Sequence, residues 1–190
     1  QFLPLVTRQK KPYHGDWPKR TFMAADFKPR DNVGVKTGEC SGWLVDVDLD
    51  GLSRDLADAI LPTTPAVFGR ASARASHRMY IAPGTEGASL GIPEALMHLC
   101  PPGGKAKIIE LFANDHLTMM PGSTHPCGER VEWDTSSPVP SHIEAPDLRV
   151  SVFRYAAAYL LVLAWDHLEH HHNDLCLALA GALKRRGWSA

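Results

Sequence analysis

The chain has 190 residues, of which 44% are hydrophobic and 22% charged, and its formal net charge is −1. These values fit one globular domain, or one domain with a small appendage, and they do not by themselves indicate a nucleic-acid-binding protein. Four scattered cysteines without a CxxC pair argue against a secreted disulfide framework and against a zinc site of the usual spacing. A looser metal site with Cys100, Cys127 and a nearby histidine stays open.

The apolar runs of the chain predict neither secretion nor a membrane span. The first residues lack a long apolar run and a small-residue cleavage site. The longest apolar stretch, Ala156 to Trp165, covers about half a membrane span and is expected to be a core helix. We therefore expect a cytoplasmic protein with no membrane partner. Because the chain starts without Met, we also expect a piece of a longer protein.

The first 135 residues predict strands mixed with short helices, which favours an α+β core. Helices are expected at 53–61, with apolar residues on one face, and at 93–99, where Pro93 occupies the favoured first position. Runs rich in Val, Ile, Leu and aromatic residues predict strands at 32–35, 42–48, 66–68, 77–81, 106–112 and 117–120.

The composition changes near residue 135, where a Pro- and Ser-rich linker begins. Two helices are expected after it, one over 147–168 and one that begins at Asn173 or Asp174. We therefore divide the chain into a catalytic body at 1–135 and a helical appendage at 145–190.

Basic residues are concentrated in two parts of the chain. Eight Lys and Arg side chains lie from Arg8 to Lys36, against three Asp, and a second group follows at Arg70, Arg74 and Arg78. A basic face beside an acidic site suits a protein that holds phosphates and metals together. The alternative is a solvated surface with uneven charge.

An apolar strand ends in alternating acids in the segment GWLVDVDLD, which starts at Gly42. Alternation along a strand places Asp46 and Asp48 on one face, roughly 7 Å apart. Two such carboxylates repel each other unless cations lie between them, and Mg²⁺ and Mn²⁺ prefer oxygen ligands of this kind. The alternative is a strand end with solvated acids, in which Asp50 is a turn residue.

A basic loop of small residues is expected in FGRASARASHRMY, which starts at Phe68 and leads into the strand that His77 opens. Small residues let a backbone approach phosphates closely, and arginines neutralise them. His77 can donate a hydrogen bond to a phosphate oxygen. The alternative is a basic surface hairpin with a structural histidine.

A third acid, Glu110, stands inside an apolar strand, and the strand after it enters a turn with Ser123 and His125. A buried carboxylate needs a partner. A shared metal is one, and a salt bridge to Lys105 or Lys107 is the alternative. Taken together, the three segments predict a two-metal site for in-line phosphoryl transfer.

These segments resemble the bifunctional primase/polymerase N-terminal domains of phage and plasmid replication proteins, in the archaeo-eukaryotic primase superfamily. The acid–x–acid motif of the family matches Asp46 and Asp48, its small–x–His motif matches ASHRMY with His77, and its third acid matches Glu110. The resemblance covers about residues 10–188. The chain departs from the family pattern at Ala75, where serine is usual, and in having Glu where several relatives have Asp.

The resemblance implies an archaeo-eukaryotic primase-like catalytic core with an RNA-recognition-like sheet, followed by a small C-terminal helical appendage. It implies a DNA primase and DNA polymerase of phage or plasmid DNA replication, with template, primer and nucleoside triphosphates as partners and often a helicase domain in the same protein. Two Mg²⁺ or Mn²⁺ ions would be held by Asp46, Asp48 and Glu110. The implied nucleotide-binding residues are Ser76, His77, Arg74, Arg78, Ser123 and His125, and the implied DNA-binding residues are Lys10, Lys11, Lys36 and Arg70.

Two other classes of function stay open. A two-metal nuclease would use the same acids but needs no loop that grips a triphosphate. A non-catalytic module for single-stranded DNA usually displays exposed aromatic residues, and the aromatic share here is only 8%. The run from His170 to His172 is interpreted as a polar loop between helices rather than as a metal site.

Overall fold

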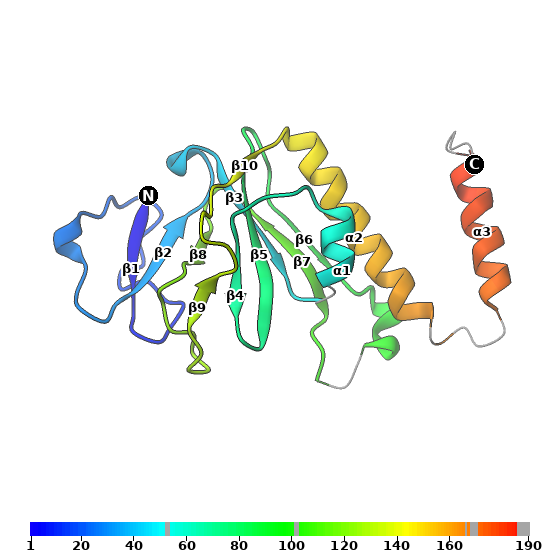
Figure 1. Ribbon diagram of the computed structural model, residues 1–190, viewed down its shortest axis with the longest axis horizontal. Helices are drawn as coiled ribbons and strands as arrows, with labels where there is room; N and C mark the ends of the chain where they lie inside the picture. The colour runs from blue at the N-terminus through cyan, green and yellow to red at the C-terminus, as the bar shows by residue number, and fades with distance from the viewer. Residues whose placement is uncertain (52–53, 101–102, 166, 168–170, 186–190) are drawn as a thin grey trace.

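The computed structural model describes residues 1–51, 54–100, 103–165, 167 and 171–185. Within these ranges the fold is α+β, as predicted, with two mainly antiparallel sheets followed by two C-terminal helices (Figure 1). Parts of the helices predicted at 53–61 and 147–168, and His170 of the predicted polar loop, lie outside the described residues.

The smaller sheet has three strands in the order β1–β2–β8. β2 (Asn32–Lys36) and β8 (Leu117–Met119) match predicted strands. β1 (Phe2–Leu5) was not predicted, because four residues that include a proline carry little strand signal. Leu3 and Leu5 of β1 are nevertheless fully buried.

The larger sheet has the strand order β6–β7–β3–β5–β4–β9, and β10 pairs with β5. The prediction missed three of these strands, β6 (Ala88–Gly91), β9 (Val131–Trp133) and β10 (Ser141–His142), which have four residues or fewer. The other strands are β3 (Leu44–Leu49), β4 (Val67–Arg70), β5 (Ala73–Ile81) and β7 (Lys107–Phe112).

The register of β3 brings the three predicted motifs side by side. β3 lies between β5 and β7, and Asp48 pairs with His77 on one side and with Glu110 on the other. Asp46 pairs with Met79 and Phe112. Since residues two apart in a strand share a face, both aspartates point to the same side of the sheet.

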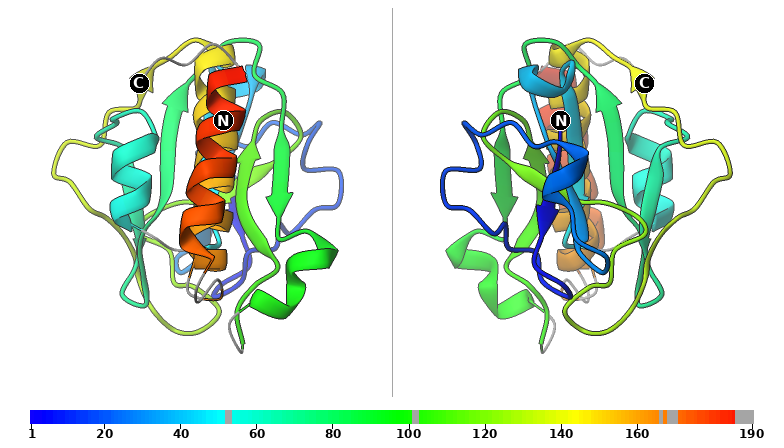
Figure 2. Two further views of the ribbon diagram at one scale, coloured as in Figure 1. Left: turned by 90° about the vertical axis from the view of Figure 1, so that its right-hand side faces the viewer. Right: turned by 90° about the vertical axis from the view of Figure 1, so that its left-hand side faces the viewer.

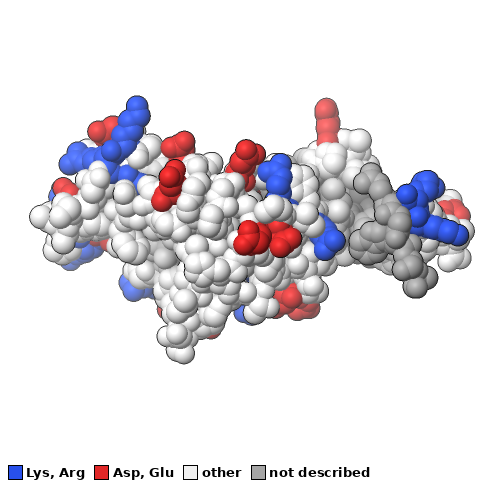
Figure 3. Space-filling model, turned by 90° about the horizontal axis from the view of Figure 1, so that it is seen from above, with Lys and Arg blue, Asp and Glu red and all other residues white. Residues whose placement is uncertain are grey.

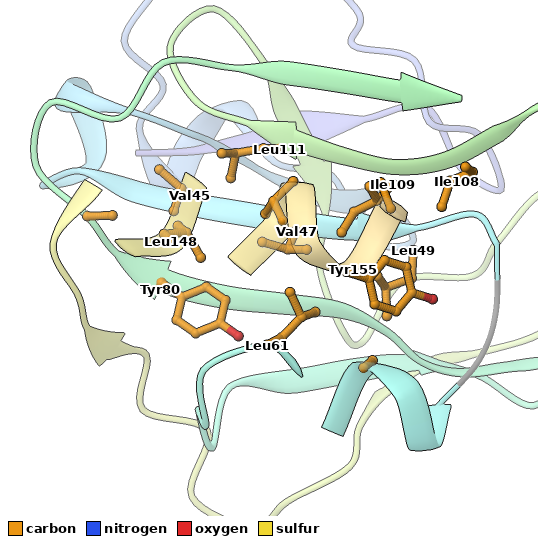
Figure 4. Close-up of a cluster of buried hydrophobic side chains, with 14 of the residues drawn as sticks. Val45, Val47, Leu49, Leu61, Tyr80, Ile108, Ile109, Leu111, Leu148 and Tyr155 are labelled. Atoms are coloured by element: carbon orange, nitrogen blue, oxygen red, sulfur yellow. The ribbon is translucent and has the colours of Figure 1, made fainter. Parts of the chain in front are cut away.

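Helices cover the opposite face of the larger sheet. α1 (Arg54–Ile60) contacts α2 (Ala145–Trp165), and α2 crosses β7 and β6. Burial of one large apolar side chain stabilises a fold by about 1.5–3 kcal/mol, so this layer holds much of the core. Figure 4 shows its centre, where Leu148 and Tyr155 of α2 meet Val45, Val47 and Leu49 of β3 and Ile109 and Leu111 of β7.

A second apolar cluster joins the two sheets on the other face. Phe68 and Met79 of the larger sheet pack with Leu3, Leu5 and Val35 of the smaller one. The larger sheet is therefore the middle layer, with helices on one side and the smaller sheet on the other. Three short 3-10 helices complete the fold: η1 (Ala24–Asp26), η2 (Glu39–Ser41) and η3 (Glu94–Leu99), which occupies the helix predicted at 93–99.

The second half of α2 is less buried than predicted. In the stretch from Ala156 to Trp165 only Ala156 is buried, and Val162 and Trp165 are 58% and 41% exposed. α3 (His172–Arg185) lies beyond α2, on the side away from the sheets (Figures 1 and 2). By length and composition alone α2 could cross a membrane, a test that core helices also pass. The boundary between a body at 1–135 and an appendage at 145–190 stays a prediction, but the first half of α2 contributes to the core of the sheet.

Two tyrosines of α2 hold the turn that follows β3. The hydroxyl of Tyr155 donates a hydrogen bond to the carbonyl oxygen of Gly51. The ring of Tyr159 lies over the same residue, and a Cβ atom at Gly51 would come within 2.8 Å of it. Any other residue at position 51 would have to displace the ring of Tyr159.

Candidate active site

Three carboxylates meet where β3 ends beside β7. Asp48, Asp50 and Glu110 each offer one oxygen within 4.8 Å of the other two, and we call them the acidic triad. Their side chains are 16%, 10% and 14% exposed, so they are accessible from one side only. Oxygen ligands in such a group suit hard divalent cations, so the triad could bind a metal.

Asp50 was considered in the sequence only as a turn residue. Its backbone N–H donates to the carbonyl oxygen of Ile108 at 3.0 Å, which keeps the chain beside β7 after β3 ends. Asp50 therefore continues the alternation of Asp46 and Asp48 and reaches the triad. The signal was present in the sequence, since the motif contains three alternating acids and not two.

Asp46 lies beneath the acidic triad instead of within it. Its side chain is fully buried, and its Oδ2 atom accepts a hydrogen bond from Thr118 Oγ1 at 2.8 Å and lies 2.9 Å from His77 Nδ1. Its Oδ1 atom is buried without a hydrogen-bond partner in the described part of the chain. The cluster in the structure thus differs from the predicted metal set, because Asp50 takes the place of Asp46. Thr118, on β8, was not singled out in the sequence.

His77 is held on three sides. Its ring stacks on Phe68 with centroids 4.7 Å apart, Nδ1 faces Asp46, and Nε2 lies 3.7 Å from Asp48 Oδ1. Burial lowers the pKa of His77, but the carboxylates of Asp46 and Asp48 outweigh this effect and leave the pKa above its ordinary value. His77 is therefore suited to donate a hydrogen bond from Nε2 into the site.

Within the acidic triad, the charged form of Asp48 is unfavourable. Burial raises the pKa of Asp48 from 3.8 to about 6, with smaller contributions from Asp46 and Asp50, while nearby His77 opposes the rise. A carboxyl with a raised pKa in a group of three is the electrostatic state that a bound cation would relieve. The residues present therefore fit a divalent metal.

The acidic triad opens into a cleft of about 820 Å³ between the two sheets. Four cationic side chains also line the cleft, and we call them the cationic rim: Lys10, Arg70, Lys105 and Lys107. Two of them pair with the triad, since Lys107 Nζ lies 2.6 Å from Glu110 Oε1 and Lys105 forms an ion pair with Asp50. The salt bridges considered as alternatives for Glu110 thus exist in part, through Lys107. Cations around clustered carboxylates are the arrangement expected where metals and phosphates bind together.

The segment at 68–80 forms a hairpin of β4 and β5 instead of a loop that leads into a strand. This is the hairpin considered as the alternative, but its histidine faces the cleft. Ala75 has a left-handed backbone, with φ of 54°, where the pairing between the two strands becomes irregular. Ser76 and His77 follow directly and both line the cleft.

Three of the six residues predicted to bind nucleotide line the cleft, namely Ser76, His77 and His125. The other three lie elsewhere. Arg74 pairs with Glu132 and Asp134 on the surface.

Arg78 follows His77 in β5 and points to the opposite face, where it is buried and paired with Asp58 of α1. Ser123 is buried and exchanges hydrogen bonds with the backbone of Val33. The structure therefore does not bring Arg74, Arg78 or Ser123 to the triad.

Only some of the residues predicted to bind DNA line the cleft. Lys10 and Arg70 line the cleft, and Lys11 is exposed beside Lys10. Lys36 is buried, and its Nζ atom donates to the carbonyl oxygens of Pro18 and Arg20, so it is not available to a phosphate. In Figure 3, Lys and Arg side chains gather at the end of the molecule where β1 and β2 lie.

A fold of two sheets with a carboxylate triad and a cationic rim in the cleft between them is typical of enzymes that bind metals and phosphates. The family model for the N-terminal domain of bifunctional DNA primase/polymerases matches residues 1–147. The chain therefore belongs to this family, and its sheets and helices form the fold of the archaeo-eukaryotic primases. It is a DNA primase/polymerase domain, and DNA and nucleotides are the partners that the family implies. A comparison with curated proteins found no match.

Proposed function

We propose that this domain transfers nucleotides from dNTP or NTP to the 3′-hydroxyl of a primer or of a first nucleotide, as directed by a template. The observation that supports this best is the acidic triad beside His77 in a cleft with a cationic rim. A triphosphate carries several negative charges, and its transfer needs both metals and cations around it.

In this proposal Asp48, Asp50 and Glu110 hold two Mg²⁺ or Mn²⁺ ions. Bound there, the metals would favour ionisation of the attacking hydroxyl and neutralise charge on the phosphates. Ligation by Asp48 requires its ionised form, so the raised pKa of this carboxyl predicts that metal affinity falls below about pH 6.

His77 would bind a phosphate oxygen of the incoming nucleotide through Nε2, and Asp46 would position it. In the protonated imidazole, which the raised pKa of His77 favours, Nδ1 donates to Asp46 Oδ2 while Nε2 keeps its own proton for the phosphate, and Thr118 fixes the carboxylate from the neighbouring sheet. Asp46 is thus proposed as a positioning residue and not as a metal ligand.

The cationic rim would change partners when substrate binds. Lys105 and Lys107 now neutralise Asp50 and Glu110, the same carboxylates that metals would occupy. Once metals bind there, both ammonium groups become available for phosphates. Lys10 and Arg70, which also line the cleft, would contact template or primer phosphates, and Ser76 and His125 would contact the nucleotide.

Primer extension tests this proposal. The domain is given a primed template with a labelled primer, the four dNTPs and Mn²⁺ or Mg²⁺, beside Asp50→Asn and Glu110→Gln variants. Arg74→Gln, which changes a surface ion pair outside the cleft, is the matched control. Extension by the wild type and the control, with loss in both triad variants, would support the proposal.

Two other outcomes would contradict it. Shortening of the primer would indicate a nuclease, and DNA binding without any change in primer length would indicate a non-catalytic module. The cytoplasmic setting remains a proposal from the sequence, and a phage or plasmid origin and an attached helicase remain proposals from the resemblance.

A further inference from the structure

A cysteine and a histidine face each other at the rim of the cleft, in a hairpin turn whose cysteine has no role in the proposed reaction. Cys127 Sγ lies 2.9 Å from His125 Nδ1. The turn is tight, since the backbone N–H of His125 donates to the carbonyl oxygen of Glu129 and that of Gly128 donates to the carbonyl oxygen of His125. Cys127 is exposed, whereas the imidazole of His125 lines the cleft.

The hydrogen bonds determine which atom carries the proton. The backbone N–H of Cys127 donates to His125 Nδ1 at 3.2 Å, so Nδ1 is the unprotonated nitrogen of the ring. With Nδ1 as the acceptor, the thiol is the donor in the contact between Cys127 Sγ and Nδ1, and a second acceptor, Glu129 Oε2, lies 3.8 Å from Sγ. A thiol that donates to an imidazole nitrogen is the arrangement by which a histidine activates a cysteine as a nucleophile.

The surroundings keep this histidine neutral. Partial burial lowers the pKa of His125, and the nearby charges of Lys10 and Arg70 lower it further, with Glu129 opposing them. The Oε2 atom of Glu129 accepts from Ser72 Oγ at 2.7 Å, lies 3.6 Å from Arg70 and is also 3.8 Å from Cys127 Sγ. A neutral imidazole has a lone pair for the thiol proton at pH 7; the lowered pKa makes it a weaker base than an ordinary histidine, so the 2.9 Å contact carries the argument.

The other cysteines lack this arrangement. Cys40 Sγ contacts the carbonyl oxygen of Thr37 at 3.7 Å, and Cys100 Sγ contacts that of Lys105 at 3.8 Å. Cys176 is exposed on α3. In the described part of the chain, Cys127 is the cysteine with an imidazole at hydrogen-bond distance, and the remaining three serve as internal references.

We propose that Cys127 is a modification site at which small disulfides, of the glutathione class, form a mixed disulfide that obstructs the cleft. The thiol proton moves to His125 Nδ1, and the thiolate attacks one sulfur of the disulfide. The disulfide bond breaks, a new bond forms to Cys127 Sγ, and the departing thiolate takes the proton from His125. Cys127 is oxidised and one sulfur of the reagent is reduced, so the exchange needs no further oxidant.

The adduct would act on the entrance of the cleft. Its carboxylates would be drawn to Lys10 and Arg70, which line the cleft and lie close enough to His125 to affect its pKa. A bulky anion there would compete with the phosphates that the proposed function brings to the same cations. This part of the inference rests on the proposed function, whereas the reactivity of Cys127 does not.

The reactivity is tested on the full chain with oxidised glutathione at pH 7, with each cysteine followed by peptide mass mapping. Cys127 is expected to react about tenfold faster than Cys40 and Cys176, and His125→Ala is expected to abolish this advantage. His142→Ala, which removes an exposed histidine of β10, is the matched control and should change nothing. In urea the advantage should vanish, since it depends on the fold.

Equal rates for the exposed cysteines in the folded protein, or an unchanged Cys127 rate in His125→Ala, would overturn the proposal. Obstruction is measured as binding of a fluorescent dNTP with Mn²⁺ before and after modification. Binding should weaken at least about fivefold in the wild type, recover with reductant, and stay constant in Cys127→Ser. Unchanged binding by the fully modified protein would refute obstruction. A reduced protein that binds no nucleotide would instead count against the proposed function.

Discussion

Asp48→Asn is expected to stabilise the metal-free protein at neutral pH, although it removes a proposed metal ligand. The pKa of Asp48 is about 6 in the folded chain, against 3.8 for the free side chain. Between these values the folded state binds the proton more tightly than the unfolded state. The free energy of unfolding therefore falls as the pH rises through this window, and the loss is complete above pH 6.

The magnitude follows from the same two values. A pKa that rises from 3.8 to about 6 corresponds to roughly 3 kcal/mol of stability lost at pH 7. Relaxation of the site reduces this figure, so we expect Asp48→Asn to gain about 1–3 kcal/mol, with a Tm rise of roughly 2–4 °C for each kcal/mol. The gain should shrink at pH 4, where Asp48 is protonated in the folded wild type.

Thermal unfolding in EDTA at pH 7 and pH 4 measures this effect, with the exposed Asp16→Asn as control. Added Mn²⁺ should reverse the order, because the wild type gains binding energy that the variant loses. A lower Tm for Asp48→Asn than for the wild type in EDTA at pH 7 would refute the reasoning. It would show that Asp48 is satisfied by its protein neighbours and leaves no charge for a metal to balance.

Three more predictions separate the roles of neighbouring residues. Asp46→Asn should keep Mn²⁺ affinity within about threefold of the wild type while primer extension falls at least about tenfold, because Asp46 acts through His77. An equally large loss of Mn²⁺ affinity, measured by calorimetry, would show that Asp46 is a metal ligand. Tyr155→Phe should lower the free energy of unfolding by about 1 kcal/mol in denaturant titrations and weaken Mn²⁺ binding, since the hydroxyl holds Gly51. Unchanged values in both assays would show that this hydrogen bond does not support the acidic triad. Arg78→Met should alter stability by about 1–3 kcal/mol but leave extension per folded molecule unchanged, and a specific loss of extension would restore Arg78 to the nucleotide site.

The proximity of three residues of the candidate site could be predicted from the sequence, because strand alternation and apolar flanks are strong local signals. Asp48, His77 and Glu110 lie on three predicted strands, and pairing of those strands is enough to bring them together. What alternation could not tell was where β3 ends. For that reason Asp50 was considered only as a turn residue and Asp46 was predicted to be a metal ligand. In the structure Asp46 is fully buried, whereas Asp50 lies in the acidic triad and is partly exposed to the cleft.

Arg78 and Lys36 lie away from the cleft for different physical reasons. Arg78 follows His77 in a strand, as predicted, and alternation alone already places the two side chains on opposite faces, which the nucleotide-binding prediction did not take into account. Lys36 was counted as basic surface, yet its ammonium group is buried among backbone carbonyls of a distant loop. Tertiary contacts of this kind leave no pattern in the local sequence.

The tyrosines that hold Gly51 have a consequence for where this domain can be cut or fused. The family match ends at residue 147, whereas Tyr155 and Tyr159 lie beyond it and fix the residue next to Asp50. A fragment trimmed to the family boundary would lose both rings and with them the support of one carboxylate of the triad. Shortened versions of the domain should therefore keep the chain through at least Tyr159. Any segment fused to α2 adjoins a helix that contacts the turn after Asp50.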